Sequence, residues 1–296
     1  MNKRSQKAWS YVVLTGPGLL IYASVIIFPV VFSIVLGFMS WDGLGTATWA
    51  GLANYLKAFK DPVFWHGMRN NLLIVAISVF GQIPLGFILA YIIYRRLVRG
   101  TNFFSTMIFL PIVINPVVLG VLWDYVFGPP GVVTALMRMI YHDPRYVFAA
   151  MEDPSGAIFP ILFVILWVYT GLYMVIYIAN LQKISPSVIE AALIDGASEW
   201  QVLGKVIFPA MVGVLFTTGV FAISGSLASF NLIYAMTGGG PAHYTEVIAI
   251  YQYINTFVYY HYGFGAALSV VIVVLSVGLI SVLNAVLGRF ERRYEG

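Results

Sequence analysis

Long apolar runs, separated by short polar or charged segments, dominate the sequence. A run of about 20 apolar residues is long enough to cross the hydrocarbon core of a bilayer as an α-helix. The pattern therefore predicts an all-α fold, a polytopic transmembrane helical bundle that forms a single domain over residues 1–296. We expect about six spans, placed at 11–39, 71–94, 101–125, 158–179, 209–236 and 264–287.

The two ends of the chain carry the longest runs. The first run follows three basic residues, a start that a secretory signal peptide shares. The apolar region of a signal peptide is only about 7 to 15 residues long, so the run at 11–39 favours a retained span. The last uncharged stretch, 247–288, is too long for one span, and its aromatic cluster at 259–262 predicts a short outer helix before the sixth span.

Composition indicates that lipid is the solvent. Hydrophobic residues make up 60% of the chain and charged residues 9%, with a mean hydropathy of +0.88, whereas about a quarter of the residues in a soluble domain are charged. Cysteine is absent, which excludes disulfides, thiolate metal sites and cysteine nucleophiles. The net charge of +4 does not indicate a nucleic-acid partner, because the basic residues are sorted by side of the membrane.

Orientation follows from this sorting, since cytoplasmic loops retain Lys and Arg. With six spans, eleven of the sixteen basic residues fall on the side that holds both termini. We therefore expect a multi-pass membrane protein with both termini in the cytoplasm. The residues on that side are Lys3, Arg4, Lys7, Arg95, Arg96, Arg99, Lys183, Lys205, Arg289, Arg292 and Arg293.

The inner loop at 183–208, between the fourth and fifth spans, predicts two short helices joined at a glycine. Ser185 and Ser198 occupy positions where a side chain can cap a helix, and Gly196 suits the left-handed conformation that ends one. Each helix is expected to present one apolar stripe. This pattern fits two roles equally, an anchor at the membrane surface or an element that docks on another protein. The stripes are Val188, Ile189, Ala192 and Leu193 in the first helix, and Trp200, Leu203 and Ile207 in the second.

The residues of this loop resemble a known motif. Glu190-Ala191-Ala192, Asp195-Gly196-Ala197 and Ile207-Phe208-Pro209 resemble the cytoplasmic "EAA" loop in permease subunits of binding-protein-dependent ABC importers. In that family the loop forms coupling helices that seat in a cleft of a separate ATPase subunit. Phe208 stands where leucine is usual, and Val212 where proline is often found. The ATPase-coupling residues that the resemblance implies are Glu190, Ala191, Ala192, Asp195, Gly196 and Ala197.

Other segments extend the resemblance over most of the chain. The stretches 109–111, 236–241 and 262–269 read FLP, MTGGGP and YGFGAALS, and they are similar to the maltose and glycerol-3-phosphate permease group of sugar importers. Membership of that group implies a second, related permease subunit, ATP-binding subunits that hold ATP and Mg, and an extracytoplasmic solute-binding protein. It implies no cofactor in this chain.

Polar residues within the fifth predicted span are candidates for a solute path, because unpaired polar groups in hydrocarbon are costly. Ser224, Ser226, Ser229 and Asn231 cluster there. Packing between helices is the alternative use of such small residues. The resemblance to the maltose permease family selects positions that line its solute cavity. The implied substrate-pathway residues are Asn115, Tyr169, Tyr173, Ser226, Ser229 and Phe230.

No catalytic or metal site can be assembled from the remaining residues. The glycine cluster at 238–241 lacks the Gly-Lys-Ser/Thr ending of a phosphate loop, and the four histidines have no metal-ligand spacing. The chain is therefore expected to be no enzyme. What the resemblance implies is a permease subunit of the bacterial inner (cytoplasmic) membrane, which forms half of the translocation pathway of an ATP-driven importer for a carbohydrate or related polyol. A secondary transporter or channel not driven by ATP is the alternative, and a structural membrane subunit is a third possibility.

Overall fold

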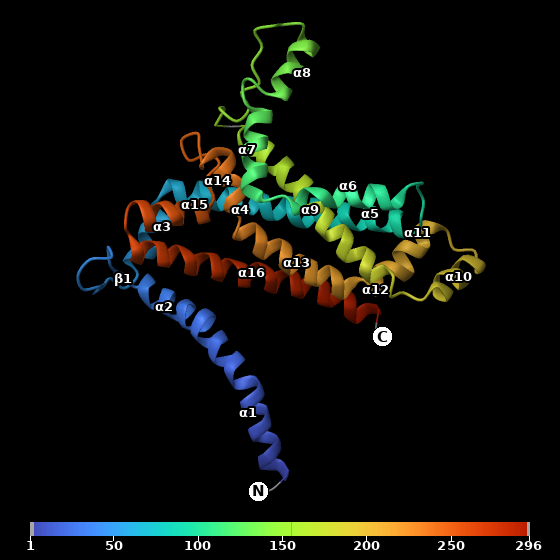
Figure 1. The fold of residues 1–296 in the computed structure, drawn as a ribbon, viewed down its shortest axis with the longest axis horizontal. Helices are drawn as coiled ribbons and strands as arrows, with labels where there is room; N and C mark the ends of the chain where they lie inside the picture. Colours follow the sequence, from blue (N-terminus) through green and yellow to red (C-terminus); the bar gives the residue numbers. More distant parts are fainter. Residues whose placement is uncertain (1–2, 155, 295–296) are drawn as a thin grey trace. The chain divides into compact units, whose positions relative to one another are not determined.

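The computed structural model describes residues 3–154 and 156–294, and helices account for most of them (Figure 1). The prediction of an all-α polytopic bundle is confirmed. We expect both chain ends in the cytoplasm, and their last residues, 1–2 and 295–296, lie outside the described residues. The side chains of the basic residues near both ends lie outside the described part as well. In the described part, six helical segments are long and apolar enough to cross a membrane: Val13–Gly37, Pro62–Tyr94, Pro116–Tyr141, Ile158–Leu181, Val212–Thr237 and Tyr262–Gly288.

Several of these segments combine shorter helices, and η marks a π-helical turn. The elements in chain order are α1 (Lys3–Tyr22), η1 (Ala23–Ile27), α2 (Phe28–Gly37), β1 (Met39–Ser40), β2 (Thr48–Trp49), α3 (Ala53–Lys60), α4 (Pro62–Ile77), η2 (Ser78–Gln82), α5 (Ile83–Tyr94), α6 (Thr101–Val113), α7 (Pro116–Phe127), α8 (Val132–Tyr141), α9 (Ile158–Leu181), α10 (Pro186–Ile194), α11 (Glu199–Val202), η3 (Leu203–Ile207), α12 (Phe208–Ala210), α13 (Val212–Leu227), α14 (Asn231–Thr237), α15 (Ile248–Tyr253), η4 (Ile254–Val258) and α16 (Tyr262–Tyr294).

By its internal contacts the chain divides into two units, residues 1–61 with 252–271 and residues 62–251 with 272–296. In the first unit, β1 and β2 pair antiparallel just after α2. The side-chain amide of Asn54 on α3 donates to the carbonyl oxygens of Gly37 and Met39, at 3.0 and 2.8 Å. The bond to Gly37 satisfies a carbonyl group that the end of α2 leaves without a helical partner, and the bond to Met39 ties α3 to β1.

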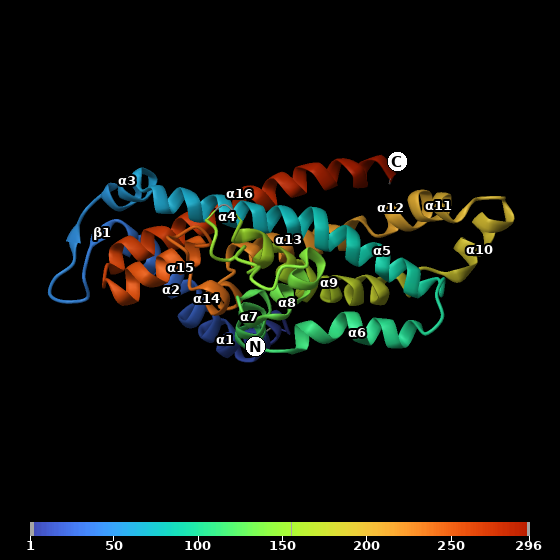
Figure 2. The ribbon, with the colours of Figure 1, turned by 90° about the horizontal axis from the view of Figure 1, so that it is seen from above.

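In the second unit, α9 packs along both α5 and α6 (Figures 1 and 2). Gly86 on α5 lies so close to α9 that a Cβ atom there would stand 2.9 Å from the Cβ of Tyr173. Small residues of this kind let helices approach closely in lipid, where van der Waals packing drives association. Around the contact, Phe87, Met174 and Tyr177 are buried in one apolar cluster.

Two of the expected spans are broken helices. The span expected at 101–125 consists of α6 and α7, because Pro116 lacks the N–H that a continuous helix needs and restricts the residue before it. In the span expected at 209–236, α13 ends at Leu227 and α14 begins at Asn231. Backbone at membrane depth tolerates such breaks only where protein or water satisfies its polar groups.

Two neighbouring asparagines of α4 supply hydrogen-bond partners for backbone groups near the second break. Asn71 is fully buried; its amide nitrogen donates to the carbonyl oxygen of Ser226 at 3.1 Å, and its Oδ1 accepts from the backbone N–H of Ile248 at 2.9 Å. Asn70 donates to the carbonyl oxygen of Tyr244 at 2.7 Å. One helix thereby holds both the broken fifth span and the loop that follows α14.

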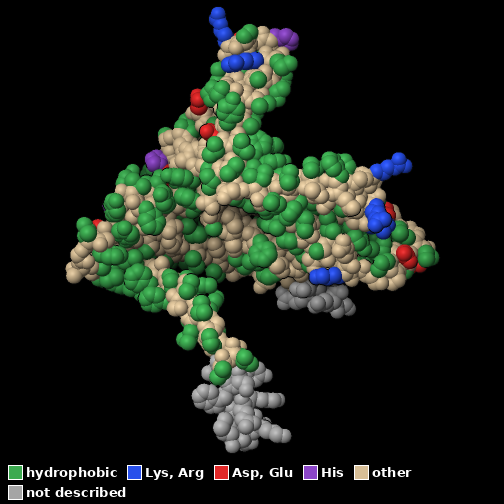
Figure 3. Space-filling model, in the orientation of Figure 1, with side chains coloured by type: hydrophobic (Ala, Val, Ile, Leu, Met, Phe, Trp, Pro, Cys, Tyr) green, Lys and Arg blue, Asp and Glu red, His purple; other side chains and the backbone are tan. Residues whose placement is uncertain are grey.

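Charged side chains of the second unit gather at the α10–α11 end and around α8, while hydrophobic side chains cover much of the face between them (Figure 3). Arg95 contacts Glu199 at one end of the α4–α5 helix, and Asn70 contacts Tyr244 toward the other. The loops after the second and fourth spans thus share one end of the unit. This is the arrangement that alternate crossing of a membrane requires.

Candidate functional site

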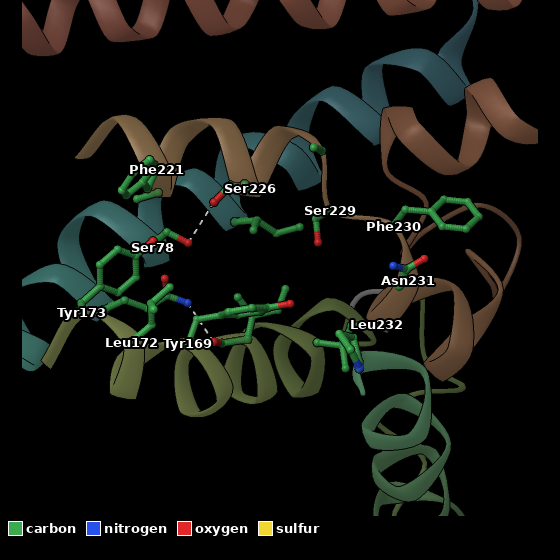
Figure 4. Close-up of a pocket in the computed structure, with 17 residues that line it drawn as sticks. Ser78, Tyr169, Leu172, Tyr173, Phe221, Ser226, Ser229, Phe230, Asn231 and Leu232 are labelled. Carbon is green, nitrogen blue, oxygen red and sulfur yellow. Dashed lines mark hydrogen bonds between the residues drawn. The ribbon is translucent and has the colours of Figure 1, made fainter. Parts of the chain in front are cut away.

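The second unit contains a partly open cavity of about 250 Å³, shown in Figure 4. Its wall is built from η2 and the end of α4, from the middle of α9, and from the break between α13 and α14, with one residue from the start of α7. All of the lining residues are uncharged: Ile74, Ser78, Gln82, Pro116, Ile165, Tyr169, Leu172, Tyr173, Phe221, Ala222, Gly225, Ser226, Ala228, Ser229, Phe230, Asn231 and Leu232.

Hydrogen bonds fix the polar part of the wall. The hydroxyl of Ser226 on α13 donates to that of Ser78 on η2 at 2.9 Å, and both residues are buried (Figure 4). The side-chain amide of Gln82 donates to the carbonyl oxygen of Ile165 on α9 at 2.8 Å. The π turn η2 therefore joins both of the other main walls, and π turns within helices are frequent at functional sites.

Five of the six predicted substrate-pathway residues meet at this cavity, namely Tyr169, Tyr173, Ser226, Ser229 and Phe230. They come from α9 and from the end of α13 with the break that follows it, two parts of the chain separated by more than forty residues. Their role in binding a solute stays a prediction.

Asn115 is not among the lining residues, and Phe230 lines the cavity with its ring turned aside (Figure 4). Asn115 is exposed, and its Oδ1 accepts from the backbone N–H of Val117 at 2.8 Å, so the side chain caps α7 while its neighbour Pro116 lines the cavity. Phe230 stacks its ring on Tyr234, with centroids 5.0 Å apart. Figure 4 shows that ring directed away from Ser78 and Tyr173.

Ser78 and Gln82 were not among the residues predicted to line the path. The signal for them lies in the second apolar run, where the two polar residues stand four positions apart. Residues at this spacing share one face of a helix. A polar face on an otherwise apolar span marks a side that turns away from lipid.

The loop at 183–208 folds into the predicted pair of helices with a glycine between them, α10 and α11. Gly196 has a φ of +83°, in the left-handed region. Ser198 forms a capping box with Gln201: its Oγ accepts from the Gln201 N–H at 3.3 Å, while its own N–H donates to the Gln201 side chain at 2.8 Å. The expected cap from Ser185 is wrong, because that hydroxyl is hydrogen-bonded to the hydroxyl of Ser187 instead.

The two apolar stripes expected in this loop are only partly correct. Ile189 is 2% exposed and Val202 is fully buried, whereas Trp200 is 80% exposed. Successive helical residues are about 100° apart, so burying Val202 turns Trp200 to the opposite side. Among the predicted coupling residues, Ala192 and Ala197 pack against the core of the unit. The exposed ones are Glu190, Ala191, Asp195 and Gly196.

An ion pair that was not predicted attaches this loop to the end of α5. Arg95 Nη2 lies 2.5 Å from Glu199 Oε1 and its Nε donates to Oε2 at 3.2 Å, while the Tyr91 hydroxyl donates to the same carboxylate. The hydrogen bonds from Arg95, followed by that from Tyr91, lower the pKa of the Glu199 carboxyl. The hydrogen bond to Glu199 in turn raises the pKa of Arg95. Sequence reasoning placed both residues on the same side of the membrane but had no signal that they touch.

Residues 82–296 match the family described as the binding-protein-dependent transport system inner membrane component. A probable ABC transporter permease of Pyrococcus horikoshii is 32% identical over 262 residues, which cover 88% of this chain and 89% of that protein. The lactose transport system permease LacF of Rhizobium radiobacter is 31% identical over 281 residues, 93% of this chain and 92% of that protein. The resemblance to importer permeases noted in the sequence is confirmed.

A solved structure shares the fold. A chain of the bacterial alginate ABC transporter, solved in complex with a periplasmic protein that carries an alginate pentasaccharide, superposes with a TM-score of 0.82 at 19% identity. The match covers 98% of this chain and 97% of that one. Taken with the family match over most of its length, this chain belongs to the inner membrane components of binding-protein-dependent transport systems and is a multi-pass ABC transporter permease.

Proposed function

We propose that the chain forms half of the translocation pathway of an ATP-driven importer for a carbohydrate or related polyol. The observation that carries this proposal is the α10–α11 elbow, residues 183–208, whose exposed Glu190, Asp195 and Gly196 present the coupling motif to solvent. The elbow joins α9 to α13, and both helices line the cavity. A movement of the elbow is therefore delivered directly to the walls of the pathway.

The chemistry of the cavity supports a neutral, polyhydroxylated solute. Ser229, Asn231 and Tyr169 offer hydroxyl and amide groups at its wall, and such groups donate to and accept from sugar hydroxyls. The uncharged lining offers no counter-ion to a phosphate or carboxylate group. Lactose, named for a relative described above, is a neutral sugar of this class, whereas the alginate of the solved structure is an acidic polysaccharide.

A second, related permease subunit completes the site in this proposal. The cavity of about 250 Å³ is smaller than the roughly 300–1,000 Å³ of typical small-molecule sites, as expected for one half of a shared chamber. ATP and Mg²⁺ act on separate ATP-binding subunits that seat on the elbow. A solute-binding protein delivers the solute on the opposite side.

The proposed location is the cytoplasmic membrane, with the elbow and both termini inside. The bias of Lys and Arg toward that side supports this orientation. A single cysteine at position 190 tests it, because the natural chain has no cysteine to interfere. Labelling of that residue in intact cells by a membrane-impermeant maleimide contradicts the orientation.

Reconstitution tests the whole proposal. The permease is purified with the chains that accompany it, and its cognate binding protein is screened by calorimetry against maltose, lactose, sugar alcohols and glycerol-3-phosphate. The solute that binds is then used for uptake into proteoliposomes with and without enclosed ATP. Uptake that requires ATP and the binding protein supports the importer. Uptake that proceeds equally without ATP favours the secondary transporter or channel, and no uptake under either condition favours a structural subunit.

A further inference from the structure

The elbow is joined to the cavity by more than the chain itself. Its two covalent neighbours, α9 and α13, supply two walls of the cavity, and the third main wall belongs to the continuous helical segment 62–94, made of α4, η2 and α5. No peptide bond links that segment to the elbow directly. Apolar packing bridges them, because Phe87 and Tyr91 of α5 share a buried cluster with Val202 and Ile207 of the elbow. The directional polar contact between them is the ion pair of Arg95 and Glu199.

The geometry of this contact suits a mechanical connection. Arg95 engages both carboxylate oxygens of Glu199, and a bidentate guanidinium–carboxylate pair fixes direction as well as distance. Tyr91, one helical turn before Arg95, donates to the same carboxylate. Tyr91 of α5 and Arg95, which caps its C-terminal end, thus hold one residue at the first turn of α11.

The same helix carries the cavity residues. Ser78 and Gln82 lie on η2, and Arg95 follows the end of α5. At about 1.5 Å per residue, Ser78 and Arg95 are roughly 25 Å apart along the axis. Because a packed helix moves as a rigid element, a displacement at Arg95 reaches the polar wall at Ser78 through the helix itself.

We propose that Arg95 and Glu199 are positioning residues for transport, which transmit the movement of the elbow to the α4–α5 wall of the cavity. The pair lets this wall move together with α9 and α13, so that all three main walls follow the ATPase. This inference rests on the proposed ATP-driven function. It assigns a role to two residues that lie outside both the coupling motif and the cavity.

The test measures the accessibility of residues in the cavity wall, so it does not require the solute to be known. Single cysteines are placed in the cysteine-free chain as Ser78→Cys on the α4–α5 segment or Tyr169→Cys on α9. The complete complex in proteoliposomes is treated with N-ethylmaleimide, with and without ATP and vanadate, and the labelling rates are compared. Arg95→Gln and Glu199→Gln are then introduced separately into each background, with Arg99→Gln, an exposed arginine of the same loop, as the matched control.

The expected result is selective. In Arg95→Gln and Glu199→Gln, the Ser78→Cys labelling rate loses its dependence on ATP, while the Tyr169→Cys rate keeps it and ATP hydrolysis continues. The swapped pair, Arg95→Glu with Glu199→Arg, restores the response at Ser78→Cys, and Arg99→Gln behaves as the parent. Arg95→Lys, which keeps the charge but loses the planar fork, gives a reduced response and serves if Arg95→Gln does not assemble.

Two results overturn the inference. If a variant that lacks the pair assembles and its Ser78→Cys labelling still responds to ATP as in the parent, the pair transmits nothing. Equal loss of the response at Ser78→Cys and Tyr169→Cys shows that the pair only stabilises the elbow. If the parent complex itself shows no ATP-dependent labelling at either position, the proposed function fails and the inference falls with it.

Discussion

Ser226 donates its hydroxyl hydrogen to Ser78 across the cavity, at an oxygen–oxygen distance of 2.9 Å. The bond joins α13 to the π turn η2 at the point where the fifth span is about to break. Both serines are almost completely buried. The bond therefore ties two buried hydroxyls together, and the pair belongs to the framework of the cavity as much as to its wall.

Removal of either hydroxyl is expected to cost little and to be non-additive. A buried hydrogen bond between membrane helices averages about 0.6 kcal/mol, so Ser78→Ala and Ser226→Ala should each lower the free energy of unfolding by roughly that amount. The double variant should cost no more than the larger single change, because both remove the same bond. Thermal unfolding in detergent measures this cycle, with the exposed Ser224→Ala as the control. Fully additive losses contradict a direct Ser78–Ser226 bond.

Asn71 should be far less tolerant of substitution than either serine. Asn71→Leu keeps the branched shape of the side chain but leaves the N–H of Ile248 without its buried partner. It removes one of the hydrogen bonds to the carbonyl oxygen of Ser226, to which the Ser229 N–H also donates. Each unsatisfied buried group costs about 1–3 kcal/mol, so a clear fall in the thermal midpoint and in the yield of assembled complex is expected. Asn102→Leu, at an exposed position on α6, is the matched control. Equal midpoints for the two variants contradict the bracing role of Asn71.

The span pattern could be read from sequence because it depends on one large effect, the transfer of apolar side chains into lipid. Hydropathy is insensitive to a two- or three-residue break, and for this reason the breaks at Asn115 and at 228–230 were not predicted. Pro116 was a local signal for the first break. For the second, a partner of the Ser226 carbonyl group is Asn71, which is 155 residues away along the chain.

The loop at 183–208 shows the same division between local and distant effects. Gly196 and the Ser198 cap were predicted correctly because they depend on residues within one turn. The outward position of Trp200 was not predicted, since it depends on which face of α11 meets the α5–α9 core. The Arg95–Glu199 pair, formed across 104 residues, belongs to this second class.

Acid should weaken the attachment of the elbow. The bonds from Arg95 lower the folded-state pKa of Glu199 below the ordinary value of 4.5, so the ionised form is favoured on folding. The resulting stability is complete above the unfolded-state pKa and is lost as the pH falls through the lower, folded-state pKa. Because the Glu199 side chain is 42% exposed, solvent screening keeps the contribution small.

This pH effect can be measured on the purified permease. Thermal midpoints from neutral pH down through the carboxyl range should fall more steeply for the parent than for Glu199→Gln, which has no proton to take up at this position. Glu152→Gln, a change at an exposed carboxyl outside the elbow, should follow the parent. Superimposable curves for the parent and Glu199→Gln contradict a lowered pKa at Glu199.

Substitutions at Gly196 can distinguish the effect of backbone strain from the effect on docking to the ATPase. Its φ of +83° disfavours any side chain, although nothing lies within 4 Å of where a Cβ would stand. The strain in Gly196→Ala should therefore cost about 1 kcal/mol, and Gly196→Asn should cost less because asparagine tolerates the left-handed region. Gly204→Ala is the matched control, since that glycine also has open space around it but no positive φ.

The docking role of the elbow is tested by the charge at its surface. Glu190 is exposed on α10, so Glu190→Lys should leave the folded permease intact. The new charge should repel the basic group that we propose as its partner on the ATPase. Gly196→Asp adds both backbone strain and a charge beside Asp195. We expect both variants to insert in the membrane and to lose ATPase assembly or ATP-dependent uptake, while Gly196→Asn retains more of each than Gly196→Asp. Assembly is measured by co-purification, and hydrolysis and uptake by reconstitution with the binding protein. If Glu190→Lys and Gly196→Asp assemble, hydrolyse ATP and transport as the parent does, the elbow is only an anchor at the membrane surface, and the proposed coupling through its exposed face is wrong.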